Sequence, residues 1–511
     1  MAATNTKGIW KVITASSVGT LIEWYDFYIF GSLATVIAGQ FFPKTNPTAA
    51  LLSTLATFAA GFIVRPFGAL VFGRIGDIVG RKYTFLLTLV IMGGSTFAIG
   101  CVPNYESIGF AAPIIVLILR LMQGLALGGE YGGAATYVAE HSPAGRRGYF
   151  TSWIQTTATL GLFISLGVIL LTRHSLDADP AKSIAKFNDW GWRIPFLVSI
   201  VLVGVSIYIR LKMKESPLFS KLKEAGKTSL NPLKESFGNK TNLKIVLLAL
   251  FGAAMGQGVV WYTGQFYAQS FIENSCKVDF DQSRTIIIWA ILFATPFFVV
   301  FGALSDKIGR KWIMLSGMFL AIISYHLLFG QLLTTTDVGA RVELTQKKEI
   351  KKVFTILPNA NDTLVKTITK TVYEDGMSVA ETKTDTAYAM EGKKTLKPDI
   401  KIAKTMGNGD YWRLVFIVFI MILYVTMVYG PIAAFLVELF PTRIRYTSMS
   451  LPYHIGNGVF GGLTPFIATL LATMYSDNKL AGLMYPVIVA SICLVIGAVY
   501  ISEKIKPNTT D

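Results

Sequence analysis

Long apolar stretches dominate the chain and alternate with mostly short polar connections. A helix needs roughly 20 mostly apolar residues to cross a bilayer, and twelve stretches come near that length. Many contain glycine or polar residues, which membrane helices tolerate because neighbouring helices satisfy the freed backbone groups. The pattern predicts an all-α integral membrane protein whose twelve transmembrane helices lie near residues 11–38, 48–73, 83–102, 110–139, 150–172, 191–211, 243–270, 284–303, 312–332, 411–437, 447–474 and 481–502.

Composition supports this reading and excludes several classes. Hydrophobic residues make up 52% of the 511 residues and charged residues 15%, against about 25% charged residues in an average soluble protein. The mean hydropathy is +0.51. A soluble enzyme, a disordered protein and a disulfide-stapled secreted domain are excluded. Cys101, Cys276 and Cys493 lie too far apart in sequence for a disulfide framework or a metal cage.

The net charge of +16 depends on where the basic residues lie. They gather in alternate connections, such as Arg81 and Lys82 after the second stretch and Arg146 and Arg147 after the fourth. The short connections between them are poor in Lys and Arg. The positive-inside rule therefore predicts that both termini lie in the cytoplasm. Because this bias accounts for most of the charge, we do not expect nucleic acid as a partner.

A long polar insert, residues 333–409, interrupts the pattern between the ninth and tenth stretches. It is rich in Lys and Thr, and the topology places it outside the cytoplasm. Residues 363–369 and 377–380 alternate in polarity on either side of Asp375-Gly376, which predicts a β-hairpin. The insert is interpreted either as a solvated decoration or as a segment that captures substrate or a partner.

The chain also contains an internal repeat. The pattern G-x-x-x-D-x-x-G-R-K occurs at residues 73–82 and again at 302–311, six stretches later. Two six-span halves with equivalent loops indicate two parallel bundles related by an axis along the membrane normal. We expect an N-terminal bundle at 1–211, a cytoplasmic linker at 212–242, and a C-terminal bundle at 243–511 that carries the insert.

The duplicated loop resembles the signature of the major facilitator superfamily. Within that superfamily, residues 23–27, 61–68 and 120–134 resemble the metabolite:proton symporters. The resemblance implies the major facilitator fold, no cofactor, and residence in the cytoplasmic (inner) membrane. It also implies proton-coupled movement of organic acids or of zwitterions such as proline and betaine.

Charged residues inside the predicted spans are candidate functional residues, because charge in lipid is costly. Asp26 and Glu23 share one face of the first span. Helical rise places Asp26 and Arg120 near one depth, and sugar:proton symporters of the superfamily carry a similar Asp and Arg. The alternative is a structural ion-pair network. Predicted proton-coupling residues are Asp26, Glu23 and Glu130, and predicted substrate-binding residues of this half are Arg120, Arg65, Tyr25 and Gln123.

The second half contributes hydrogen-bonding and aromatic side chains. The seventh span carries Gln257, Trp261, Tyr262 and Gln265, and the eleventh carries Asn457. We predict that they line the substrate site, although aromatic residues in membrane helices also serve as core or as an interfacial belt.

The repeated loops are candidate cytoplasmic gates. Their acidic residues can face a helix N-terminus, where the helix dipole favours an anion, and their arginines can pair with Glu140 and Glu438. The alternative is a packing role alone. The predicted gate residues are Asp77, Arg81, Glu140, Arg146, Asp306, Arg310, Glu438 and Arg443.

Nucleotide-binding motifs and metal-ligand clusters are absent from the sequence, so transport must draw on a gradient. We predict a secondary transporter that takes up a small carboxylate-bearing metabolite with protons by alternating access. A proton-coupled proline or betaine transporter is the alternative, and an integral-membrane enzyme a distant one. The expected partners are the substrate, protons and the lipid bilayer, with the chain as a monomer.

Overall fold

The computed structural model describes residues 6–43, 46–78, 81–129, 131–143, 145–211, 232–339, 341–344, 348–356, 363–387, 399–440 and 444–502. Two compact units make up the chain. The first comprises Met1–Tyr267, Ile291–His326 and Met421–Asp511, and the second comprises Ala268–Ala290 and Leu327–Ile420. Each unit is described by itself below.

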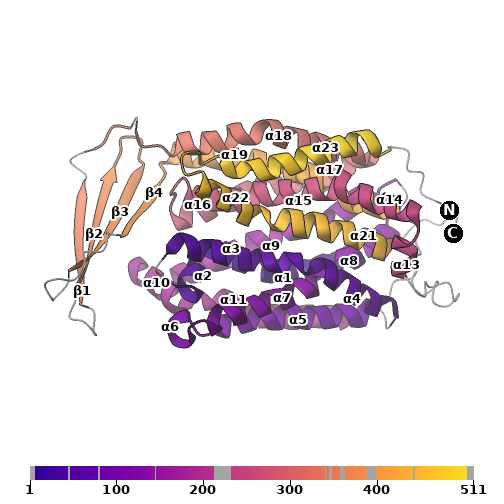
Figure 1. The fold of residues 1–511 in the computed structure, drawn as a ribbon, viewed down its shortest axis with the longest axis horizontal. Coiled ribbons are helices and arrows are strands. Elements are labelled where there is room, and N and C mark those ends of the chain that lie inside the picture. Colours follow the sequence, from indigo (N-terminus) through magenta and orange to yellow (C-terminus); the bar gives the residue numbers. More distant parts are fainter. Residues whose placement is uncertain are drawn as a thin grey trace. The chain divides into compact units, whose positions relative to one another are not determined.

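Helices from the first half of the chain lie together in the first unit (Figure 1). They are α1 (Thr6–Ser32), α2 (Ala34–Phe41), α3 (Pro47–Ile63), α4 (Arg65–Ile78), α5 (Arg81–Cys101), α6 (Tyr105–Ile108), α7 (Ala111–Gly128), α8 (Tyr131–His141), α9 (Arg147–Ser175), α10 (Pro180–Lys186), the π-helical η1 (Phe187–Gly191) and α11 (Arg193–Leu211).

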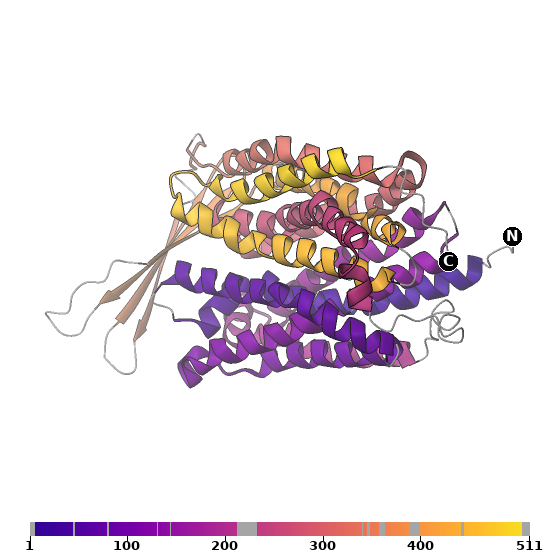
Figure 2. The same ribbon diagram turned by 45° about the vertical axis from the view of Figure 1, so that its right-hand side comes forward.

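Helices from the second half of the chain belong partly to each unit. They are α13 (Pro232–Phe237), α14 (Lys240–Ala249), η2 (Leu250–Ala254), α15 (Met255–Tyr262), η3 (Thr263–Tyr267), α16 (Ala268–Asn274), α17 (Phe280–Ile308), α18 (Arg310–Thr335), α19 (Asn408–Tyr429), α20 (Ile432–Leu439), α21 (Arg445–Tyr453), η5 (His454–Gly461), α22 (Thr464–Met474), η6 (Ala481–Leu483) and α23 (Met484–Tyr500). Those of the first unit, such as α15 and α23, can be followed in the turned view of Figure 2. Residues 212–231 of the predicted linker lie outside the described residues, and the predicted bundle boundaries stay a prediction.

The predicted spans are confirmed. In the described part of the chain, nine helices are long and apolar enough to cross a membrane, and a bent pair, Ser16–Ser32 with Ala34–Phe41, makes a tenth. Two shorter apolar helices, Leu87–Cys101 and Arg193–Val205, lie at the third and sixth predicted positions. Together these segments occupy all the predicted positions, so the fold is an all-α membrane fold of twelve helices in two six-helix bundles.

Local chemistry explains where the helices begin and break. The Asn46 side chain accepts a hydrogen bond from the Ala49 amide at 3.0 Å, and Pro47 occupies the first turn of α3, where its missing N–H is not needed. The bend between α1 and α2 is 63°. The break between α3 and α4 falls at Val64. Pro66 has no N–H to donate to the Phe62 carbonyl four residues earlier, and its ring crowds that carbonyl, so the helix cannot run on unbroken.

Three π-helical segments interrupt the second-half spans: η2 and η3 lie on either side of α15, and η5 follows α21. Such segments are frequent at functional sites. Here they accompany a very close backbone approach, because a Cβ added at Gly258 would lie 2.5 Å from the Gly456 carbonyl oxygen. Glycine at these positions lets α15 and η5 touch through their main chains.

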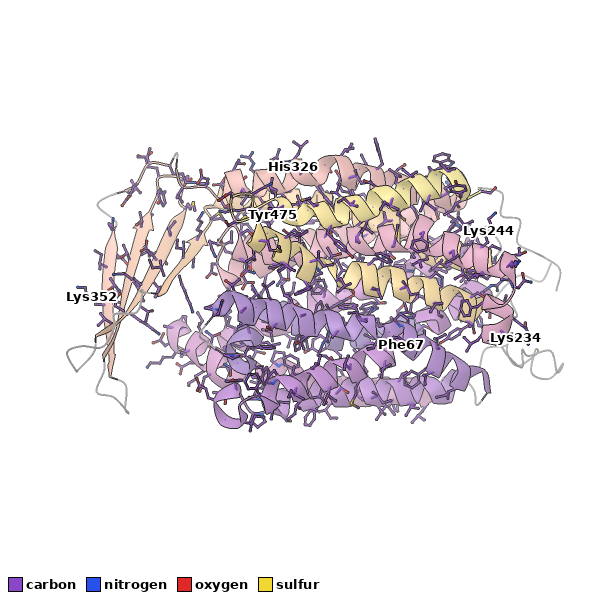
Figure 3. All side chains as sticks on the ribbon, in the orientation of Figure 1. Phe67, Lys234, Lys244, His326, Lys352 and Tyr475 are labelled. Atoms are coloured by element: carbon purple, nitrogen blue, oxygen red, sulfur yellow. The ribbon has the colours of Figure 1, made fainter. Side chains whose placement is uncertain are left out.

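The outer surface of the first unit suits lipid. Figure 3 labels Phe67 on α4 and Tyr475 after α22, which are 61% and 55% exposed. His326 is also exposed on α18. Exposed apolar side chains of this size are unusual on a soluble protein and expected on helices that face hydrocarbon.

The second unit contains the insert, which forms a four-stranded antiparallel sheet in the order β1-β2-β3-β4. Its strands are β1 (Glu349–Ile356), β2 (Thr363–Val372), β3 (Ser378–Ala387) and β4 (Asp399–Thr405). The predicted hairpin is confirmed, since Val372 pairs with Ser378 across the Asp375-Gly376 turn and Gly376 has a φ of +83°. Only the central hairpin was predicted, so the sheet is larger than expected.

Hydrogen bonds join this sheet to helix ends within the second unit. The Lys404 amide on β4 donates to the Lys277 carbonyl at 2.7 Å, and the Asp279 amide donates to the Lys404 carbonyl at 2.8 Å. Arg341 pairs with Asp375 in the hairpin turn and, at 2.8 Å, with Asp410 at the start of α19. The insert is therefore built into the connection between α16 and α17.

Candidate functional site

Aromatic side chains from both halves of the repeat meet inside the first unit. Trp24 and Tyr28 lie one turn apart on α1, and their ring centroids are 4.9 Å apart. Tyr28 also stacks on Trp261 of α15 at 5.5 Å, and Tyr262 meets Phe62 of α3 edge-on at 5.0 Å. We call this group the aromatic cluster: Trp24, Phe27, Tyr28, Phe62, Trp261, Tyr262, Phe266 and Tyr429.

Arg65, the first residue of α4, lies within this cluster. Its guanidinium carbon is 4.1 Å from the ring centre of Phe62, 4.4 Å from that of Phe27 and 5.5 Å from that of Trp24. These contacts are favourable for a cation. Its Nε and Nη2 atoms are buried and have no hydrogen-bond partner among the described residues. Because aromatic rings do not replace those hydrogen bonds, the donors of Arg65 are available to a ligand.

Neutral polar atoms in and beside the cluster are also left without partners. The Tyr28 and Tyr262 hydroxyls, the Trp261 indole nitrogen and both amide atoms of Gln265 are buried and make no hydrogen bond within the described part of the chain. Buried polar groups are normally paired, and each unsatisfied one costs about 1–3 kcal/mol. Such a concentration indicates a binding site for a polar molecule.

A hydrogen-bonded chain continues the site into the second half. The Tyr429 and Tyr453 hydroxyls are 2.8 Å apart, and the Asn457 amide donates to the Tyr453 hydroxyl at 3.0 Å. Gln257 in turn donates to Asn457 at 3.4 Å. Tyr131 of α8 stacks face to face on Tyr453 at 3.6 Å. Of the second-half residues predicted for the site, Gln257 and Asn457 are directly linked, and Trp261 and Tyr262 lie in the aromatic cluster.

Asp26 and Tyr25 point to a different neighbourhood. Asp26 is fully buried and accepts a hydrogen bond from the Ser199 hydroxyl of α11 at 2.7 Å. Its other carboxylate oxygen has no partner in the described residues. Tyr25 donates to the Pro195 carbonyl at 3.0 Å. Both side chains therefore contact α11, whereas Trp24 and Tyr28 turn to the aromatic cluster.

Arg120 of α7 is enclosed by the first half. Nη1 donates to the Gln123 side chain at 2.7 Å and to the Phe27 carbonyl at 3.5 Å, and Nη2 donates to the Phe58 carbonyl at 3.3 Å. Gln123 donates onward to Thr96 at 2.6 Å. Asp26 and Arg120 were expected at one depth, and the structure gives them separate partners.

The two remaining predicted proton-coupling residues differ in what the structure says of them. Glu23 lies on α1, three residues before Asp26, and is buried with 1% of its surface exposed. Glu130 lies outside the described residues. The proton-coupling roles of all three carboxylates stay predictions.

The second copy of the loop motif contacts the opposite half. Asp306 accepts hydrogen bonds from the amides of Gly148 and Tyr149 at 2.9 and 2.8 Å, at the N-terminus of α9. Arg310 pairs with Asp306 at 2.6 Å and with Glu438 at 3.1 Å. The acidic residue thus lies at a helix N-terminus, and Arg310 and Glu438 form the predicted pair.

Backbones approach closely at this contact. A Cβ added at Gly148 would lie 2.4 Å from the Gly302 carbonyl oxygen. The glycines at the start of α9 and in α17 therefore allow the two halves to touch main chain to main chain, beneath the Asp306 carboxylate.

The first copy of the motif is less completely described. Asp77 lies near the end of α4 and Arg81 is the first residue of α5, but their side chains lie outside what the structure describes. Arg443 lies outside the described residues. Glu140 pairs with Arg445 at 3.4 Å, and Arg146 is exposed before α9. Arg445 is thus a gate candidate that the sequence reasoning missed.

Several other site residues were missed. Tyr28, Phe62 and Tyr429 carry no charge, and charge inside a span was the signal that selected candidates. Tyr28 lies one turn from Trp24 on α1, and Phe62 lies within the 61–68 segment, whereas Tyr429 has no comparable signal in the sequence. His454, at the start of η5, is buried, and neither ring nitrogen has a partner among the described residues. Across the described residues, no three His, Cys, Asp or Glu side chains group closely enough to hold a metal ion.

Comparison with known proteins identifies the class. Residues 11–230 match the family model described as sugar (and other) transporter. The inner membrane metabolite transport protein YhjE of Escherichia coli K12 is 32% identical over 91% of this chain and 88% of its own length. The alpha-ketoglutarate permease of the same strain is 37% identical over 62% of this chain and 70% of its own.

Two further similarities complete the picture. The proline/betaine transporter of Escherichia coli K12 is 36% identical over 60% of this chain and 61% of its own length. A crystal structure of a D-xylose-proton symporter superposes with a TM-score of 0.63 at 16% identity, over 98% of this chain and 99% of that one. The site and fold define a membrane transporter rather than an enzyme. The chain belongs to the major facilitator superfamily, among its metabolite transporters.

Proposed function

We propose that this protein takes up a small carboxylate-bearing metabolite together with protons, by alternating access across the cytoplasmic membrane. The observation that carries the proposal is Arg65 at the meeting point of the two halves, whose buried Nε and Nη2 have no hydrogen-bond partner among the described residues. A carboxylate is the natural acceptor for a guanidinium. The relatives named for alpha-ketoglutarate and for proline/betaine transport support a carboxylate, since all three compounds carry one.

Proton coupling is assigned to a carboxylate inside the predicted spans, with Asp26 of α1 first and Glu23 and Glu130 as the other candidates. A carboxylate buried in lipid-embedded protein is costly when charged. Protonation of Asp26, which is bound by Ser199, removes that charge before the loaded carrier reorients.

The gate follows from the loop contacts. Asp306, Arg310 and Glu438 join α17, α18, α20 and the N-terminus of α9. We assign to them, with Glu140 and Arg445, the role of a gate that holds the end of the carrier bearing the repeated loops closed. We assign the same role to Asp77 and Arg81 in the first copy of the loop, and to Arg146 and Arg443 in the connections after the fourth and tenth spans. Two bundles at 1–211 and 243–511, both termini in the cytoplasm and a monomeric carrier complete the proposal.

Purified protein in proteoliposomes tests the function. Uptake of labelled 2-oxoglutarate, 4-methyl-2-oxopentanoate, proline and glycine betaine is measured with and without an imposed pH gradient. We expect saturable accumulation of at least one carboxylate that disappears when a protonophore collapses the gradient. Uptake that is unaffected by the protonophore contradicts proton coupling, and failure of every carboxylate to enter contradicts the substrate class.

An osmolyte transporter of the proline/betaine type is the second candidate. Trp24, Tyr28, Trp261 and Tyr262 provide aromatic faces that stabilise a quaternary ammonium group. Preference for glycine betaine in the same uptake experiment would favour this candidate.

A further inference from the structure

Two arginines lie next to the same phenylalanine, but they differ in what else they contact. The Phe27 ring centre is 4.4 Å from the Arg65 guanidinium carbon and 4.2 Å from that of Arg120. Arg65 otherwise lies over Trp24 and Phe62, and Arg120 over Phe30 and Phe58.

These neighbours place the two cations at successive levels along α1. Trp24, Phe27 and Phe30 are spaced three residues apart, which is about 4.5 Å of helical rise per step. The guanidinium over Trp24 and Phe27 is therefore one level away from the guanidinium over Phe27 and Phe30. Phe27 is the one ring that both guanidinium groups contact among the cation–π pairs given above.

The hydrogen-bonding capacity of the two arginines is also unequal. Both terminal nitrogens of Arg120 donate to protein oxygens of Gln123, Phe27 and Phe58. Its Nη2 would lie 3.4 Å from a Cβ added at Gly61, so α3 closes over it, and its Nε faces this same enclosed environment without a partner. Arg65 makes cation–π contacts and keeps Nε and Nη2 free of partners in the described residues.

Among the described residues of the site, Arg65 is the arginine with a terminal nitrogen left unpartnered, so we take it as the centre that binds the anion. The neutral donors around it, the Tyr28 and Tyr262 hydroxyls and the Trp261 indole, can assist one carboxylate. A second carboxylate on the same molecule would be buried against aromatic rings without a cation, which costs several kcal/mol.

We infer that the site takes monocarboxylates with an apolar body and that Phe27 determines this specificity by separating Arg120 from the substrate. This inference rests on the proposed function, because it assumes that Arg65 binds the substrate carboxylate. Arg120 then holds Phe27, Gln123 and the α3 backbone in place without touching the substrate.

Binding to the purified full-length protein in detergent tests the inference without requiring transport. Matched probes are 4-methyl-2-oxopentanoate against 2-oxoglutarate, and valerate against glutarate, each pair differing in a terminal carboxylate. Isothermal calorimetry gives Kd for each. We expect the monocarboxylate of each pair to bind at least tenfold more tightly, and Arg65→Gln to remove binding of both.

Variants at the two flanking residues separate specificity from folding. Arg120→Gln should keep the preference for the monocarboxylate, scored as the ratio of the two Kd values within each pair and not as either Kd alone. Phe27→Leu should keep the preference for the monocarboxylate. Phe27→Ala should tighten 2-oxoglutarate binding by at least tenfold, and the double variant Phe27→Ala/Arg120→Gln should lose that gain. Each melting temperature is recorded, and the wild-type probe pairs decide the matter even where a variant fails to fold.

Two results would overturn the inference. One is a wild-type protein that binds 2-oxoglutarate as tightly as its monocarboxylate partner or more tightly. The other is a folded Arg120→Gln variant that no longer binds monocarboxylates. In the first case pH-driven uptake of 2-oxoglutarate would still support the proposed function, whereas a lack of binding by every acid would contradict both.

Discussion

Neighbouring residues on α1 serve different parts of the molecule. Trp24 and Tyr28 turn to the aromatic cluster, while Tyr25 and Asp26 contact α11 through Pro195 and Ser199. A helix turns 100° per residue, since it has 3.6 residues per turn, so adjacent positions separate the aromatic cluster from the buried carboxylate.

Substitution of Asp26 tests the carboxylate. Asp26→Asn keeps the shape and can still bond Ser199, but it cannot carry the transported proton. We expect pH-driven accumulation to fall to background while counterflow of preloaded substrate remains within about threefold of wild type. Ser199→Ala is the matched control, because it removes a bond worth about 1.5–3 kcal/mol and leaves the titratable group. Retained accumulation by Asp26→Asn would transfer the role to Glu23 or Glu130.

Trp261 gives a prediction for the cluster itself. Its ring contacts Trp24, Tyr28, Tyr262, Phe266 and Tyr429, so Trp261→Ala removes aromatic contacts worth about 0.5–1.5 kcal/mol each beyond burial. We expect substrate Kd to rise at least tenfold in calorimetry. Trp261→Phe keeps a ring and should stay within about fivefold, and equal losses in both variants would assign the effect to the indole N–H instead.

At the scale of elements, the strongest contact between the halves is the N-terminus of α9 on Asp306. Charge-assisted bonds to backbone amides at a helix start are worth about 1–2 kcal/mol. Asp306→Asn should weaken the gate formed by the repeated loops. In that variant, a cysteine that replaces Tyr149 should react with a maleimide several-fold faster than the same cysteine in the chain that keeps Asp306. Asp477→Asn, in an exposed connection after α22, is the control. Unchanged reactivity would leave Asp306 with packing alone.

The insert gives a second prediction at this scale. Arg341 ties the hairpin turn to the start of α19 through Asp375 and Asp410. Arg341→Met should release that end of the sheet, and trypsin should cut the lysine-rich strands several-fold faster in the purified protein. Lys352→Met removes a charge from exposed β1 without touching the anchor. Equal cutting of both variants would show that Arg341 does not hold the sheet.

Sequence patterns predicted elements better than they predicted partners. The spans followed from the length of apolar runs, because lipid requires it, and the repeat placed Asp306, Arg310 and Glu438. Depth arithmetic put Asp26 and Arg120 at one level, but it contains no information about which way each side chain turns around its helix. The contact of Tyr28 with Trp261 depends on how two helices that are distant in sequence pack together. β1 and β4 are joined to their partner strands by connections too long for a local turn signal to reveal the pairing.

At the scale of the whole molecule, orientation in the membrane is the property to measure. Single cysteines replace Lys352 on β1 and Lys234 on α13 in a chain whose three native cysteines are changed to serine. In intact cells an impermeant maleimide should label the Lys352 position and spare the Lys234 position until the membrane is opened. The reverse pattern would invert the topology that the charge bias predicts.

The two edge strands of the insert's sheet differ in what covers them. The outer edge of β4 is covered by residues 277–279, which belong to the connection between α16 and α17. β1 is the terminal strand on the other side of the sheet. An open strand edge invites the same strand of another molecule to pair with it. Lys351 and Lys352 are exposed on β1 and point to opposite faces of the sheet. Two such edges would therefore bring like charges together on each face, and this repulsion opposes the joining of crowded carriers into a continuous sheet.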